Sequence, residues 1–229
     1  MAAQNIRLIV EGPKGATVEV AHSKATKQSA EKWTVDLGDI FAEEVKDIVI
    51  SVSGLDSRSL GDSAEVTVSL SYVDVLRSRP HTEPPQTITT SLPPGSTVSD
   101  RNTYVVLQHL RVSVVAALKS SAASAQARDV ARARAVIDEA LLFLTEATSG
   151  LELSPADRQV VETYKQDMHD VLPTLRTYTD YERRGSKLMS LKGQSHSMQR
   201  CNASTETEFN PYRGSSKLAY AMKMKSASK

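Results

Sequence analysis

The stretch AEVTVSLSYVDVL, residues 64–76, alternates apolar and polar side chains. One side of an extended chain would carry Val66, Val68, Leu70 and Tyr72. The other side would carry Thr67, Ser69, Ser71 and Val73. A period of two is typical of a β-strand with one buried face, so this stretch predicts that the N-terminal part of the chain is a β-sheet.

Stretches on the N-terminal side of this strand repeat the pattern. WTVDLG at 33–38 places its apolar residues on one side and stops at Gly38, and KDIVISVSG at 46–54 is apolar on both sides. Shorter candidate strands are 6–11, 16–21 and 86–91. Several short strands separated by Gly, Ser and Asp are typical of an antiparallel β-sandwich, which we expect over residues 1–78.

The segment that follows, RSRPHTEPPQTITTSLPPGSTVSD at 77–100, holds five of the nine prolines. Proline has no backbone N–H to donate to a sheet. The composition therefore predicts a Pro-rich connection over 79–100 and a domain boundary within it.

Apolar residues recur at intervals of three or four after this connection. Val106, Leu110 and Val114 give one stripe, and Ile137, Leu141 and Leu144 give a second. The spacing predicts amphipathic helices over 102–122 and 126–148. The β-branched residues of the first leave a strand at 104–115 as the alternative, although the alanines that follow favour a helix.

A third helix has a recognisable beginning, with Ser154 as N-cap, Pro155 in the first turn and Asp157 beside the helix dipole. Pro173 is expected to kink this helix, because proline removes a backbone donor and clashes with the preceding turn. Three successive helices with short links predict a small antiparallel bundle over 101–184. The complete chain is thus predicted to be α+β.

The C-terminal segment 185–229 lacks this periodicity and is strongly basic. From Arg183 onward there are ten Lys or Arg against two Glu, whereas the preceding residues hold 18 basic and 25 acidic side chains. We therefore expect an irregular, extended basic tail that meets an acidic surface. With few aromatic residues for base stacking, the tail does not favour nucleic acid as a partner.

Composition also limits the chemistry that we expect. Cys201 is the single cysteine, and no two of the five histidines have the helical spacing of metal ligands. No apolar run is long enough for a membrane span, and the N-terminus lacks the pattern of a secretory signal. We therefore predict no catalytic, metal or cofactor site, no membrane span and a cytoplasmic location.

Five stretches resemble the region that follows the von Willebrand factor A domain in many intracellular proteins. VDLGDIFAEEVKDIVISV at 35–52 is similar to its β-domain, and QHLR at 108–111, ARDVAR at 127–132 and IDEAL at 137–141 are similar to its helical part. QSHSMQR at 194–200 resembles a motif of its C-terminal extension. Some members of this family carry a U-box or RING domain associated with ubiquitin transfer.

The resemblance implies a non-enzymatic interaction or scaffold module that binds a protein, such as an A domain or a larger assembly. An alternative is the substrate-recruiting part of a ubiquitin-ligase-type protein whose catalytic module lies outside this chain. The candidate structural clasp or partner-binding residues are Ser195, His196, Ser197, Gln199 and Arg200. Cys201 with His196 as a hydrolase pair is a further alternative, which lacks a visible third group to orient the pair.

Overall fold

The computed structural model of the chain describes residues 3–22, 24–42, 44–54, 64–90, 101–200 and 211–212. It divides into two units, Met1–Asp100 and Arg101–Lys229, each of which has a hydrophobic core of its own. The first unit contains strands and the second contains helices, so the α+β prediction is confirmed.

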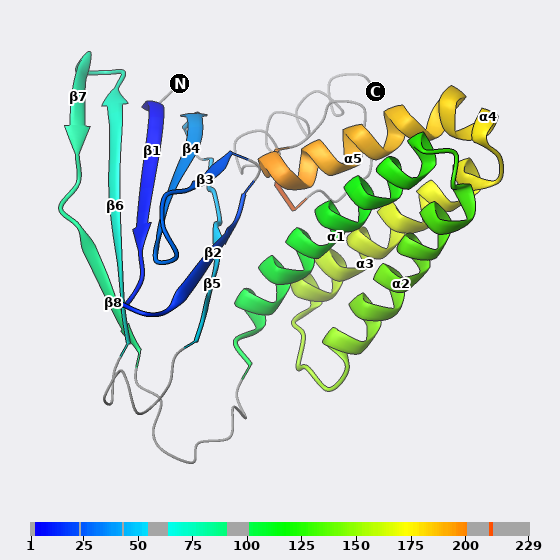
Figure 1. The fold of residues 1–229 in the computed structure, drawn as a ribbon, viewed down its shortest axis with the longest axis horizontal. Helices are drawn as coiled ribbons and strands as arrows, with labels where there is room; N and C mark the ends of the chain where they lie inside the picture. The colour runs from blue at the N-terminus through cyan, green and yellow to red at the C-terminus, as the bar shows by residue number, and fades with distance from the viewer. Residues whose placement is uncertain are drawn as a thin grey trace, which may run out of the picture. The chain divides into compact units, whose positions relative to one another are not determined.

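The N-terminal unit contains two antiparallel sheets (Figure 1). One has the strand order β3-β4-β1-β6-β7, with β8 also on β6, and the other pairs β2 with β5. The strands are β1 (Ala3–Glu11), β2 (Thr17–Ala21), β3 (Ala25–Lys27), β4 (Lys32–Ile40), β5 (Val49–Ser53), β6 (Ala64–Asp74), β7 (Arg79–Thr82) and β8 (Gln86–Thr90).

The two sheets share one core, in which Val10 and Val35 of the larger sheet meet Val18 and Val20 of the smaller one. Trp33 reinforces the contact, because its indole Nε1–H donates to the carbonyl of Val18 at 2.6 Å. Burial of both inner faces explains why these strands alternate in sequence.

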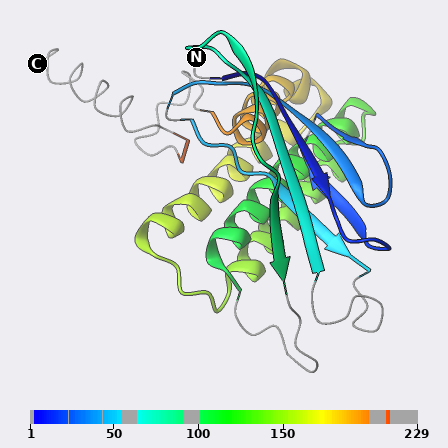
Figure 2. The ribbon, with the colours of Figure 1, turned by 90° about the vertical axis from the view of Figure 1, so that its left-hand side faces the viewer.

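Two sequence expectations for this unit are corrected. Residues 79–90 are not a connection, because β7 and β8 follow one another along one edge of β6 (Figure 2). Pro80 is tolerated in β7 because an edge strand can leave one side unpaired. Strand β4 also continues past Gly38, whose φ of +69° accompanies a shift in the pairing register. Residues 91–100 lie outside the described part.

The C-terminal unit begins with three helices, α1 (Thr103–Gln126), α2 (Val130–Thr148) and α3 (Pro155–Val171). The strand considered for 104–115 is therefore wrong. Each helix has a side-chain N-cap, from Asn102, Asp129 and Ser154 respectively, as the Ser154 motif predicted for α3. Pro173 lies in a 3₁₀ turn, Leu172–Leu175, so that α3 ends where the kink was expected.

A further helical segment completes this unit. The short helix α4 (Tyr178–Asp180) leads through a π-helical turn, Tyr181–Gly185, into α5 (Ser186–Met198). Helix α1 contacts α2, α3 and α5 and is therefore central to the bundle (Figure 1). The extended form predicted for residues 185–198 is wrong, because tertiary contacts of α5 compensate for its weak apolar pattern.

The core of the helical unit is formed by side chains from all four of its longer helices. Leu110, Leu118, Ile137, Tyr164 and Met168 are among its fully buried members. Burial of an aliphatic side chain of this size contributes about 1.5–3 kcal/mol. This core fixes the positions from which polar residues of α1, α3 and α5 converge.

Candidate functional site

Helix α5 carries most of the residues predicted as a clasp and ends in a closed turn. Gln199 adopts the left-handed conformation, with φ 50° and ψ 47°. The backbone N–H groups of Gln199 and Arg200 donate to the carbonyl of Ser195, and the Ser195 hydroxyl donates to the Arg200 carbonyl at 2.6 Å. These bonds satisfy the helix end and compensate for the strained backbone at Gln199.

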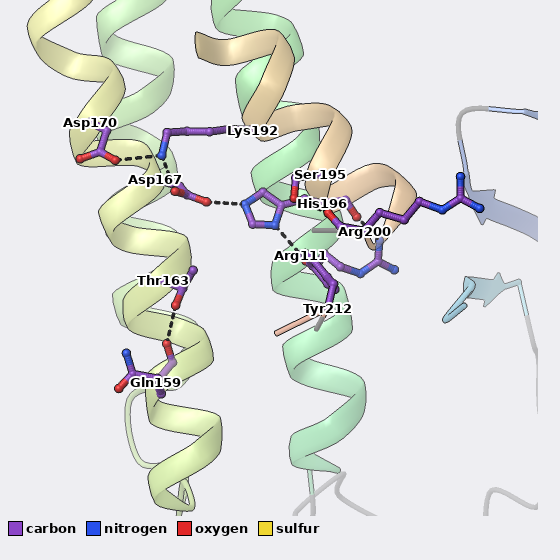
Figure 3. Close-up of polar contacts among 10 residues, drawn as sticks. All are labelled: Arg111, Gln159, Thr163, Asp167, Asp170, Lys192, Ser195, His196, Arg200 and Tyr212. Carbon is purple, nitrogen blue, oxygen red and sulfur yellow. Dashed lines mark hydrogen bonds and ion pairs between the residues drawn. The ribbon is translucent and has the colours of Figure 1, made fainter. Parts of the chain in front are cut away.

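His196 lies at the centre of a buried polar cluster (Figure 3), and its side chain is only 2% exposed. Its Nε2 is 2.7 Å from Oδ2 of Asp167 on α3, and its Nδ1 is 2.8 Å from the hydroxyl of Tyr212. An ionised carboxylate only accepts hydrogen bonds, so Nε2 carries a proton. In the neutral ring, Nδ1 then accepts from the Tyr212 hydroxyl.

Aromatic rings enclose the imidazole on two sides. The ring of Tyr164 meets it edge-on, with centroids 5.2 Å apart and an interplanar angle of 86°. The ring of Tyr212 lies 5.8 Å away at 74°. Burial, and then the neighbouring Tyr164 hydroxyl, raise the pKa of the Tyr212 phenol, which therefore stays neutral.

Lys192 lies one turn before His196 and adds a buried positive charge. Its ammonium contacts the carboxylates of Asp167 and, at 2.8 Å, Asp170. Burial opposes ionisation of Asp167, but hydrogen bonds and charge from His196 and Lys192 outweigh it and lower the pKa of this carboxyl. Burial likewise opposes the charge on Lys192, and the two carboxylates outweigh it and raise the pKa of its amine.

Arg111 joins α1 to the same cluster. Its side chain is buried, and its guanidinium donates to the His196 carbonyl at 3.0 Å and to Oε1 of Gln108 at 2.8 Å. The cationic guanidinium thus caps the C-terminal end of α5, where the helix dipole is negative. The cluster therefore links α1, α3 and α5 through charge-assisted hydrogen bonds.

The predicted residues have different places in this arrangement. Ser195, His196 and Gln199 are buried, and Ser197 is half-buried on α5. Arg200 joins the cluster through its backbone, while its guanidinium points away from His196 (Figure 3). Cys201 lies outside the described residues.

The sequence analysis missed Arg111, Tyr164, Asp167, Lys192 and Tyr212. A signal was present, since Met189, Lys192 and His196 follow the three- and four-residue spacing of one helical face. That face is largely polar, so a search for apolar periodicity passes over it.

An Asp–His pair can move a proton in general acid–base catalysis. Here both ring nitrogens of His196 already have partners, and a reacting group would have to replace Tyr212. Among the described residues, no group of three His, Cys, Asp or Glu side chains is arranged to hold a metal ion. The geometry is that of a polar cluster whose hydrogen bonds hold α1, α3 and α5 together.

Comparison with known proteins found no matching family model and no matching curated protein. No helix in the described ranges has the length and hydropathy needed to cross a membrane.

Proposed function

We propose that this chain is a non-enzymatic protein-interaction or scaffold module. The observation that carries the proposal is a group of three exposed apolar side chains, with one histidine, on two neighbouring helices. We call this group the α1–α2 patch, and it consists of Val105, Leu142 and Phe143 with His109.

One contact between rings joins the two helices within the patch. The rings of His109 and Phe143 meet with centroids 6.0 Å apart at 64°, and Val105 lies one turn before His109 on α1. Leu142 is 64% exposed, Val105 58% and Phe143 38%. Large apolar side chains grouped on a helical surface mark places where proteins bind one another.

The buried polar cluster also supports a scaffold. Its charged groups are engaged in hydrogen bonds that join α1, α3 and α5, so the relative positions of these helices are specified. A rigid arrangement of helices lowers the entropy cost of presenting a binding surface.

The partner is expected to bury the α1–α2 patch. A von Willebrand factor A domain is the first partner to test, because residues 35–52 and 194–200 resemble the region that follows such a domain in other proteins. Binding of a purified A domain can be measured by titration calorimetry.

The test compares two variants that each add two lysines. Leu142→Lys with Phe143→Lys alters the patch, whereas Ser120→Lys with Ala123→Lys changes exposed positions in the last turns of α1. After mild cross-linking in a native extract, we expect the wild type and the control variant to retain the same proteins and the patch variant to lose them. Equal retention by all three chains, or no retained protein, would overturn the proposal.

A further inference from the structure

Tyr212 fills a socket whose walls come from three helices of the same chain. What we call the Tyr212 socket is formed by Arg111 of α1, Asp167 of α3 and His196 of α5 (Figure 3), together with Tyr164 of α3. The occupant reaches it from beyond the end of α5, 16 positions after His196.

The socket has the chemistry that recognises a phenol. The rings of Tyr164 and His196 provide aromatic contact, and Nδ1 of His196 is 2.8 Å from the phenolic oxygen. Asp167 orients the imidazole from its opposite side. Without a hydroxyl to meet it, the buried Nδ1 would lose its partner, so such a site discriminates tyrosine from phenylalanine.

The chain's own tyrosine is an intramolecular ligand on a tether. Residues 201–211 separate it from Arg200, the last residue of the closed helix end. A ligand on the same chain can have an effective concentration in the millimolar range. A ligand from another molecule must compete with that concentration or wait until Tyr212 leaves.

We infer that the Tyr212 socket is a binding site for the unphosphorylated tyrosine of a peptide segment in a partner protein, occupied here by the chain's own Tyr212. A phosphate on that tyrosine would need room beside the phenol, whose surroundings are closed by the buried ring of His196 and by Tyr164. The inference goes beyond the proposed function, since it concerns a second site and does not depend on the α1–α2 patch.

The experiment uses the full chain and a fluorescent peptide with the sequence of residues 207–217, TEFNPYRGSSK. Tyr212→Ala empties the socket, and Tyr220→Ala is the matched control in the same C-terminal segment. If the peptide binds with a Kd of about 0.1 mM, competition by the tethered tyrosine should weaken its binding to the wild type and control about tenfold. Fluorescence anisotropy measures this difference.

Two altered peptides test the chemistry of the ligand. Replacing the peptide's tyrosine by phenylalanine, or phosphorylating it, should each weaken binding to the Tyr212→Ala chain at least about tenfold. Should this chain lose helical circular dichroism, the tyrosine peptide is expected to restore it. Equal binding to wild type and Tyr212→Ala, tighter binding of the phosphopeptide, or an unfolded variant that the peptide does not restore would each overturn the inference.

Discussion

At the scale of single residues, His196 has contacts on both sides of its ring that hold separate parts of the chain. Asp167 comes from α3 and Tyr212 from beyond α5, while Arg111 of α1 binds the His196 backbone. Removing one member leaves buried polar groups without partners, which costs more than the net contribution of an intact pair. Substitutions in this network should therefore lower the stability of the fold strongly.

We predict that His196→Ala lowers the free energy of unfolding by about 3 kcal/mol, because it removes a buried side chain together with two hydrogen-bond partners. Urea denaturation followed by helical circular dichroism measures the change. His169→Ala, at an exposed position of α3, is the control and should stay within about 0.5 kcal/mol of the wild type. Similar stability of both variants would contradict a clasp role for His196.

Asp167 should make the free energy of unfolding decrease as the pH falls into the acid range. Because its pKa is lower in the folded protein, its contribution is complete above the unfolded value of about 3.9 and is lost as pH falls further, through the folded pKa. In Asp167→Asn the decline below about pH 4 should be shallower by up to about 1.4 kcal/mol per pH unit. Denaturation at a series of pH values measures these slopes.

Asp138→Asn is the matched control for this experiment. Asp138 is exposed on α2, and its ion pair with Arg134 spans 4.0 Å, so it should change the acid slope much less. The same slope in wild type and Asp167→Asn would show that the buried ion pairs do not couple folding to protonation.

At the scale of elements, two glycines in the C-terminal helical segment have opposite steric surroundings. A Cβ at Gly185, in the π-helical turn, would lie 2.8 Å from Oγ1 of Thr174 and 3.0 Å from the ring of Tyr181. A Cβ at Gly193 in α5 would approach nothing closer than 3.9 Å. Alanine substitutions at these two positions therefore separate the effect of overpacking on stability from the effect of helix propensity.

We predict that Gly185→Ala destabilises the protein by about 1–3 kcal/mol, because the new methyl group has no room. Gly193→Ala should instead stabilise it by up to about 1 kcal/mol, since alanine is the better helix former. Thermal unfolding of both variants measures the two effects. If both variants changed the free energy of unfolding in the same direction, the close contact between Gly185 and Thr174 would not account for the difference between the two positions.

At the scale of the whole molecule, the two units have separate cores. The core of the strands draws on residues 8 to 66 and that of the helices on residues 106 to 189. The helical unit includes 129 residues, the common size of an independently folding domain.

We predict that a fragment spanning residues 101–229 folds alone. Its helical signal should disappear in one cooperative urea transition, with the same midpoint as the helical transition of the full chain. Circular dichroism of both chains measures the two midpoints. A fragment with a broad, non-cooperative transition would show instead that the N-terminal unit supports the helices.

Much of this fold follows from patterns in the sequence. Strand β2 and helices α1 to α3 bury apolar residues at the period of their own secondary structure, so the pattern indicates the element. The strands missed were β3, which has three residues, and β7, which contains Pro80 at the sheet edge. Their backbone pairing depends on neighbouring strands more than on their own side chains.

The sequence by itself determined that strands are followed by three helices and that Ser154 caps α3, because those features depend on local spacing and hydrogen bonds. Only the tertiary structure decided that residues 186–198 are a helix with a polar buried face, and that Asp167, His196 and Tyr212 meet. The physical reason is that a buried polar group is stabilised by partners distant in sequence. No local pattern records where those partners will lie.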